Sequence, residues 1–160
     1  MAKYVGIFLA GLLVGALAGG GTVYLVGSPP NPFEPPSAAI PEQAAAHKLA
    51  LTTTLRFGEA IDDRNLAAFR ATTTEEFQQR FSLDAFERAF SGFIDQQINV
   101  LTVEGMDPVL TTLEGGPDSD SLRLAGYFPT QPSRLDFDYS YTRAGPRWQL
   151  SGIDVKVAPR

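Results

Sequence analysis

The chain has 160 residues, a formal net charge of −5 and no cysteine. The missing cysteine excludes disulfides, thiolate metal sites, a catalytic thiol and a lipid-modified cysteine. The acidic balance offers no electrostatic attraction to nucleic acid, so we expect no nucleic-acid partner.

The N-terminal segment predicts a transmembrane anchor over residues 1–26. Between Tyr4 and Val26 there are 23 residues without a charge, which as a helix would measure about 34 Å and cross a bilayer. Tyr4 and Tyr24 would then lie at the two headgroup levels, and Lys3 favours a cytoplasmic N-terminus. We therefore expect a single-pass signal-anchor in the inner (cytoplasmic) membrane, with the lipid bilayer as a partner and the rest of the chain periplasmic or extracellular.

A cleavable signal peptide is the alternative interpretation of this segment. Ala16-Leu17-Ala18 matches a small-x-small cleavage pattern, and cleavage after Ala18 would send the chain to the same compartment. The apolar run continues to Val26, however, which a secreted N-terminus does not need. This continuation favours an uncleaved anchor.

Three glycines repeat at four-residue spacing inside the apolar segment: Gly11, Gly15 and Gly19. Small residues at this spacing let two membrane helices approach closely. The pattern predicts a helix-association face, and with it self-association or pairing with an envelope protein partner.

Residues 27–42 read as a proline-rich linker that holds six of the twelve prolines. Proline lacks an N–H and fixes φ, so this stretch favours an extended polyproline II spacer. The remaining residues, 43–160, suffice for one small domain with a single core.

The first half of this domain has helical periodicity. Helices are expected at about 41–61, 65–71, 73–81 and 83–97, with a capping box of Thr73 and Glu76 starting the third and Ser82 capping the fourth. Six of the eleven phenylalanines lie between Phe69 and Phe93. Their spacing predicts rings that fill a core rather than a cofactor site.

After residue 98 the apolar period changes to two, and Gly- and Pro-containing turns separate four expected strands, at 108–114, 121–128, 134–143 and 147–157. In the third strand, apolar residues from Leu135 to Tyr141 share one face, while Asp136 and Asp138 point to the other. A change of phase at Ser151-Gly152 predicts a β-bulge.

Helices followed by an antiparallel sheet predict an α+β fold with the helices packed on one side. The long first helix, the phenylalanine-rich helices, the segment Leu124-Ala-Gly-Tyr-Phe-Pro129 and the segment Arg147-Trp-Gln-Leu-Ser-Gly-Ile153 resemble the NTF2-like (SnoaL-like) superfamily. The resemblance covers about residues 43–158 and implies an NTF2-like cone, in which N-terminal helices pack on a curved antiparallel sheet. Some members of that superfamily are isomerases, dehydratases or hydrolases, while others bind ligands or partners, so the fold alone does not decide function.

Candidate pocket residues are Tyr127, Tyr139, Tyr141, Trp148 and Asp95. In an enzyme the tyrosines would donate hydrogen bonds and Asp95, at the expected sheet-facing end of the long helix, would supply a carboxylate. In a ligand-binding protein, Tyr139, Tyr141 and Trp148 would line an apolar cavity, whereas core packing across a hairpin is the alternative for these rings. His47, the only histidine, is expected on the surface, which departs from members of the superfamily that use a pocket His–Asp pair.

The sequence therefore favours a membrane-anchored envelope protein that binds or scaffolds and is non-catalytic. The alternative is a small-molecule-binding or enzymatic NTF2-like domain acting on an apolar ligand. One histidine without cysteine predicts no metal site, no phosphate-binding loop is present, and we assign no catalytic residues and expect no cofactor.

Overall fold

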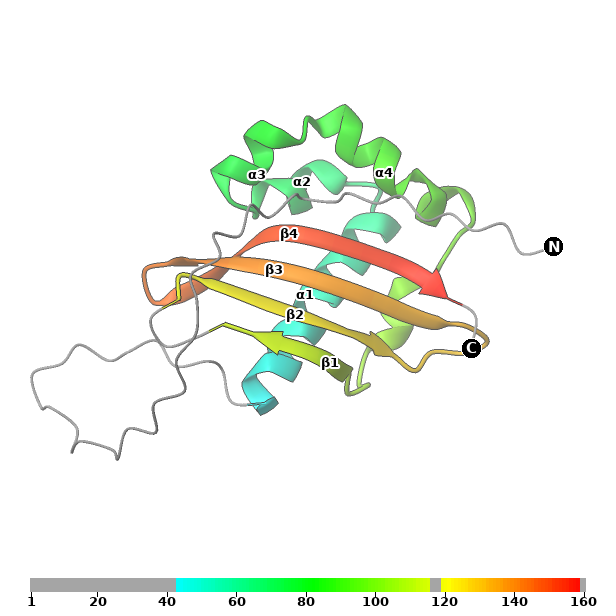
Figure 1. Ribbon diagram of the computed structural model, residues 1–160. Helices are drawn as coiled ribbons and strands as arrows, with labels where there is room; N and C mark the ends of the chain where they lie inside the picture. The colour runs from blue at the N-terminus through cyan, green and yellow to red at the C-terminus, as the bar shows by residue number, and fades with distance from the viewer. Residues whose placement is uncertain (1–42, 116–118, 159–160) are drawn as a thin grey trace, which may run out of the picture.

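The computed structural model describes residues 43–115 and 119–158. The helices are α1 (Gln43–Asp62), α2 (Leu66–Ala71), α3 (Glu75–Arg80), α4 (Leu83–Asp95) and the 3-10 helix η1 (Val100–Val103); the strands are β1 (Val109–Glu114), β2 (Ser121–Phe128), β3 (Arg134–Ala144) and β4 (Arg147–Ala158). This part of the chain has an α+β fold, with four α-helices and an antiparallel sheet of order β1-β2-β3-β4. In Figure 1, α1 crosses behind the sheet and α2, α3 and α4 lie beyond its β4 side.

Side-chain caps explain where the short helices begin. Asn65 and Ser82 each accept a backbone N–H bond from the first turn of the helix that follows, and the cap predicted at Ser82 is confirmed. The cap predicted at Thr73 is wrong by one residue. Thr74 accepts from Phe77 N at 3.3 Å, while the Thr73 hydroxyl donates to Arg70 O at the end of α2.

The core forms where α1 meets both the other helices and the sheet. Five of the six phenylalanines between Phe69 and Phe93 are buried, which confirms their predicted core role, and Phe81 is half-buried. Phe57 of α1 lies among them at 0 % exposure, with its ring in edge contact with the rings of Phe69, Phe90 and Phe93. The aromatic cluster therefore joins α1, α2 and α4.

Alternation along β3 separates the two faces of the sheet as predicted. The side chains from Leu135 to Tyr141 that share the apolar face are all buried, and those between them are only partly so. The predicted bulge is also confirmed, because Ser140 pairs with Gly152 and Tyr141 with Leu150, which leaves Ser151 as the extra residue.

A second bulge lies in β1, where the sequence predicted none. Leu110 pairs with Gly126 and Thr112 pairs with Ala125, so Thr111 is the extra residue of β1. Its hydroxyl donates to Ala125 O at 3.2 Å. This bond fixes the bulge against β2.

In the two described stretches no helix is both long and apolar enough to cross a membrane. The predicted anchor over residues 1–26 and the predicted linker over residues 27–42 lie outside them, as do Gly11, Gly15 and Gly19.

Candidate functional site

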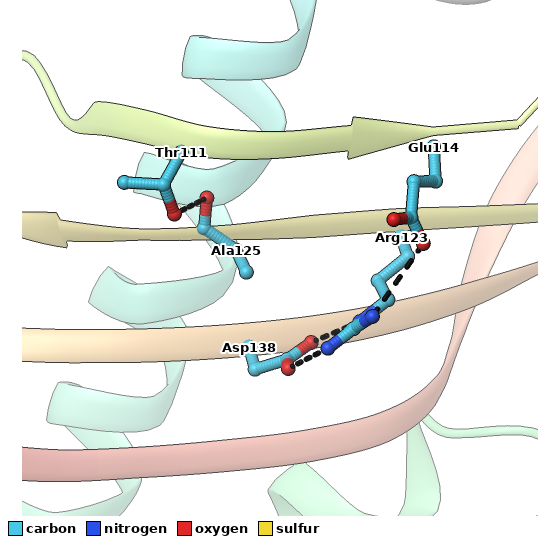
Figure 2. Close-up of polar contacts among 5 residues, drawn as sticks. All are labelled: Thr111, Glu114, Arg123, Ala125 and Asp138. Atoms are coloured by element: carbon cyan, nitrogen blue, oxygen red, sulfur yellow. Dashed lines mark hydrogen bonds and ion pairs between the residues drawn. The ribbon is translucent and has the colours of Figure 1, made fainter.

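One face of the sheet is buried against helices, and the other carries charged side chains. We call the second the open face; its side chains are Val109, Thr112 and Glu114 of β1, Arg123, Ala125 and Tyr127 of β2, Arg134, Asp136, Asp138 and Ser140 of β3, and Asp154 and Lys156 of β4. They alternate along the strands with the buried residues. Figure 2 shows Arg123 and Asp138 in front of the sheet, with α1 behind it.

Arg123 and Asp138 form a two-bond ion pair on the open face. Arg123 donates from Nε to Asp138 Oδ1 at 3.0 Å and from Nη2 to Oδ2 at 2.6 Å, so the pair is bidentate (Figure 2). Glu114 of β1 lies 3.5 Å away from Arg123 Nη1. The hydrogen bond and the charge of Asp138 raise the pKa of Arg123. The side chains of Arg123 and Asp138 are about two-fifths exposed. Ion pairs at such exposure contribute little to stability, so the network orients charges more than it stabilises the fold.

Asp154 of β4 lies directly opposite Asp138 in the register of the sheet. Burial raises the pKa of Asp154; the positive charge of Lys156 opposes this rise, and the negative charges of Asp138 and Asp136 add to it. Like charges placed directly opposite on a sheet are unfavourable. Among the carboxylates of the open face, Asp154 is therefore the one that protonation or a neighbouring cationic group would stabilise most.

The neighbouring row of the open face combines an ion pair with an aromatic ring. Arg134 Nε lies 2.7 Å from Asp136 Oδ1, and the Arg134 guanidinium lies over the ring of Tyr127, 4.9 Å from its centroid. Tyr127 pairs with Asp136 across β2 and β3, and Asp136 pairs with Lys156 across β3 and β4. The predicted pocket residue Tyr127 thus belongs to the open face.

Tyr139 and Tyr141 point to the opposite face, into the core. Tyr139 Oη bonds with Thr54 Oγ1 at 2.7 Å, and Tyr141 Oη bonds with Thr53 Oγ1 at 2.8 Å. Both rings are buried, and burial raises the pKa of each phenol above the ordinary 10.0. The two hydroxyls therefore tie β3 to α1 as neutral groups.

The other candidates lie apart from this pair. Trp148 is half-buried near the start of β4, with the Arg143 guanidinium 5.5 Å from a ring centroid. Asp95 is exposed at the end of α4, and His47 is half-buried in the first turns of α1. The structure thus brings Tyr139 and Tyr141 together but places Tyr127 on the other side of the sheet.

Sequence reasoning missed Arg123, Arg134 and Asp154 as members of a site. The available signal was the alternation of β2, β3 and β4, which places Arg123, Arg134 and Asp154 on the polar side of their strands. In the described part of the chain, no group of three or more His, Cys, Asp or Glu side chains could hold a metal ion. The open face therefore offers ionic and hydrogen-bonding contacts.

We expect Asp154→Asn to raise the free energy of unfolding at neutral pH. Because the folded-state pKa of Asp154 is raised, its contribution to stability is fully present below the unfolded pKa and is lost as pH rises through the folded pKa. The asparagine variant does not carry this loss. Urea unfolding over a series of pH values should show its advantage over the natural chain growing across that window.

Asp63→Asn is the control, because it removes one carboxylate that is exposed after the end of α1. Its unfolding curve should follow that of the natural chain at every pH. An advantage of Asp154→Asn that stays constant with pH would contradict the raised pKa of Asp154 in the folded chain.

In comparisons with known proteins, no family model, no curated protein and no solved structure matches this chain. The NTF2-like resemblance therefore stays a prediction about the domain.

Proposed function

We propose that this chain is a single-pass membrane protein that holds an NTF2-like α+β domain outside the cytoplasm on a proline-rich stalk. There the domain binds a protein partner through the open face and performs no chemistry. The observation that carries the proposal is the open face itself, where charged side chains are held in ion pairs on the side of the sheet opposite α1, one across β2 and β3 and one within β3.

The membrane part of the proposal rests on the sequence. An uncharged run of 23 residues is long enough for a bilayer, and the prolines that follow it suit a spacer. The N-terminal positive charge favours a cytoplasmic N-terminus. The domain would then be displayed at the far side of the membrane, where it can meet an envelope protein.

The absence of chemistry is supported by the place of the tyrosines. The hydroxyls of Tyr139 and Tyr141 are already bonded to Thr54 and Thr53, and both rings are buried in the core. A substrate could use them as donors only after these bonds were broken in a buried site. Core packing is therefore the better-supported role for this pair.

The chemistry of the open face defines the kind of partner that fits it. Asp138 fixes the guanidinium of Arg123 through two hydrogen bonds. The guanidinium of Arg134 contacts the carboxylate of Asp136 and the ring of Tyr127. A cationic group would stabilise the charged form of Asp154, because burial and the negative charges of Asp138 and Asp136 all disfavour it. A protein surface that places a Lys or Arg side chain against Asp154 fits this face, and such contacts contribute mainly to specificity.

Site-specific photocrosslinking in native membranes tests the proposal. A photoreactive phenylalanine analogue at Ser140, in the middle of the open face, should crosslink to one discrete envelope protein. The same analogue at Gln79, exposed on α3, is the control and should give no such product. Asp154→Arg, introduced into the Ser140 chain, should abolish the product because it repels the cationic group.

Equal products from Ser140 and Gln79, or a product unaffected by Asp154→Arg, would overturn the proposal. Native mass spectrometry of the full chain in detergent separates the alternatives. We expect the intact mass, whereas a mass lacking residues 1–18 would show cleavage instead of an anchor. A retained small apolar molecule would favour the ligand-binding alternative.

A further inference from the structure

The two edge strands of the sheet, β4 and β1, differ in their hydrogen-bond partners. The β4 edge receives Thr74 N, which donates to Leu150 O at 2.9 Å, and Gln149 donates to Thr73 O at 3.0 Å. Strand β1, at the other edge, pairs within the described residues with β2 only. Among the residues that the structure describes, β1 therefore has a row of backbone groups on its outer side with no strand paired to it.

This outer edge is apolar. Three large hydrophobic side chains are exposed in the described part of the chain, and two of them, Val109 at 41 % and Leu113 at 39 %, belong to β1. Glu114 is the only charged residue of the strand, and β1 contains no lysine or proline. Edge strands that avoid pairing usually carry lysine or proline, so the residues of β1 do not prevent pairing, but a strand that pairs with it must match its bulge.

Because of the bulge, the order in which the side chains of β1 point to the two faces of the sheet is the same whether the strand is followed from Val109 or from Glu114. Val109 and Glu114 lie opposite Tyr127 and Arg123, on the open face, whereas Leu110 and Leu113 lie opposite the helix-facing positions Gly126 and Leu124. Two threonines, Thr111 and Thr112, stand between the leucines. In either direction, the first residue lies on the open face, the second on the helix side, two threonines follow, the fifth residue lies on the helix side and the last on the open face.

We propose that two copies of this chain pair through β1, antiparallel, about a two-fold axis between Thr111 and Thr112. Each Leu110 then lies beside Leu113 of the partner subunit on the helix side, and each Val109 beside Glu114 of the partner subunit on the open face. Antiparallel pairing puts directly opposite residues on the same face, which this order satisfies for the Leu110–Leu113 and Val109–Glu114 pairs on either side of the axis. The two four-stranded sheets become one continuous sheet.

Pairing through one six-residue strand buries little surface, so the dimer is weak and reversible. It goes beyond the proposed function, because it uses the edge strand β1 and leaves the open-face side chains of β2, β3 and β4 accessible to another protein. Anchoring both copies in one membrane would raise their effective concentration, but the pairing does not require the anchor. Failure of one proposal therefore leaves the other standing.

Cysteine crosslinking of the full chain in mild detergent tests this register. The natural chain has no cysteine, so only the introduced cysteines can form a disulfide. Leu110→Cys and Leu113→Cys chains are purified separately, mixed and gently oxidised. We expect about tenfold more disulfide-linked dimer in the mixture than with either chain alone. Opposite residues lie within disulfide reach, whereas two copies of one position would be about 11 Å apart.

Two further pairs make the outcome decisive. Val109→Cys mixed with Glu114→Cys tests the same register on the open face, where both side chains are exposed and a folding defect is not expected. Val157→Cys mixed with Leu113→Cys is the control, since Val157 is 42 % exposed on β4. Crosslinks in both β1 mixtures with none in the control support the dimer. Absence from both β1 mixtures, or equal yield in the control, overturns it.

Discussion

Replacing Phe57 by alanine should lower the free energy of unfolding by about 4 kcal/mol. Phe57 has no exposed surface, and its ring centroid lies 5.7, 4.8 and 5.5 Å from those of Phe69, Phe90 and Phe93. Alanine leaves a cavity at the point where three helices meet, and a packed core relaxes only partly around such a cavity. The three edge contacts are lost as well.

Urea unfolding followed by circular dichroism measures this loss. Phe81→Ala is the matched control, because Phe81 is half-buried and, among the described residues, contacts one other aromatic ring, that of Phe77, and the Arg80 guanidinium. We expect about 2 kcal/mol there. Equal losses for the two variants would mean that Phe57 does not hold α1, α2 and α4 together.

Much of the fold follows from local signals in the sequence. The alternation from Leu135 to Tyr141 identified β3 and its faces, and the change of phase at Gly152 located the bulge of β4. Polar residues before apolar runs located the helix starts, though Thr73 and Thr74 are two equivalent candidates in a row. Spacing alone could not choose between two adjacent threonines.

Two features lacked a local signal. Helix η1 has only four residues, Val100–Val103, too few to show a period, and it forms where the chain passes α1 on the way to the sheet. The bulge at Thr111 arises in a stretch whose alternation is broken by two adjacent threonines. Both follow from packing against distant parts of the chain.

The same distinction applies to the candidate site. The outward direction of Asp136 and Asp138 was predictable from alternation and is confirmed. The bonds of Tyr139 to Thr54 and of Tyr141 to Thr53 join residues 85 and 88 positions apart, so no local sequence pattern predicts them. Arg123 could be placed on the polar side of β2, but its partner Asp138 depends on the register between β2 and β3.

Gly126→Ala should detach β1 from the sheet and lower the free energy of unfolding by about 3 kcal/mol. A Cβ at this position would lie 2.1 Å from Val109 O and 3.0 Å from Leu110 Cα, and both are backbone atoms that no rotamer change can move. Because β1 pairs with β2 alone among the described residues, the strain is relieved when β1 moves away. Amide hydrogen exchange should therefore quicken over Val109–Glu114 far more than over β3.

Gly145→Ala separates this steric effect from the conformational cost of replacing a glycine. Gly145 has φ +62° in the turn between β3 and β4, and nothing lies within 4 Å of an added Cβ, so we expect about 1 kcal/mol and unchanged exchange in β1. The detached strand also links this variant to the proposed dimer. If pairing occurs through β1, Gly126→Ala must abolish the Val109–Glu114 crosslink while Gly145→Ala retains it, because only the first removes the edge that the two copies share.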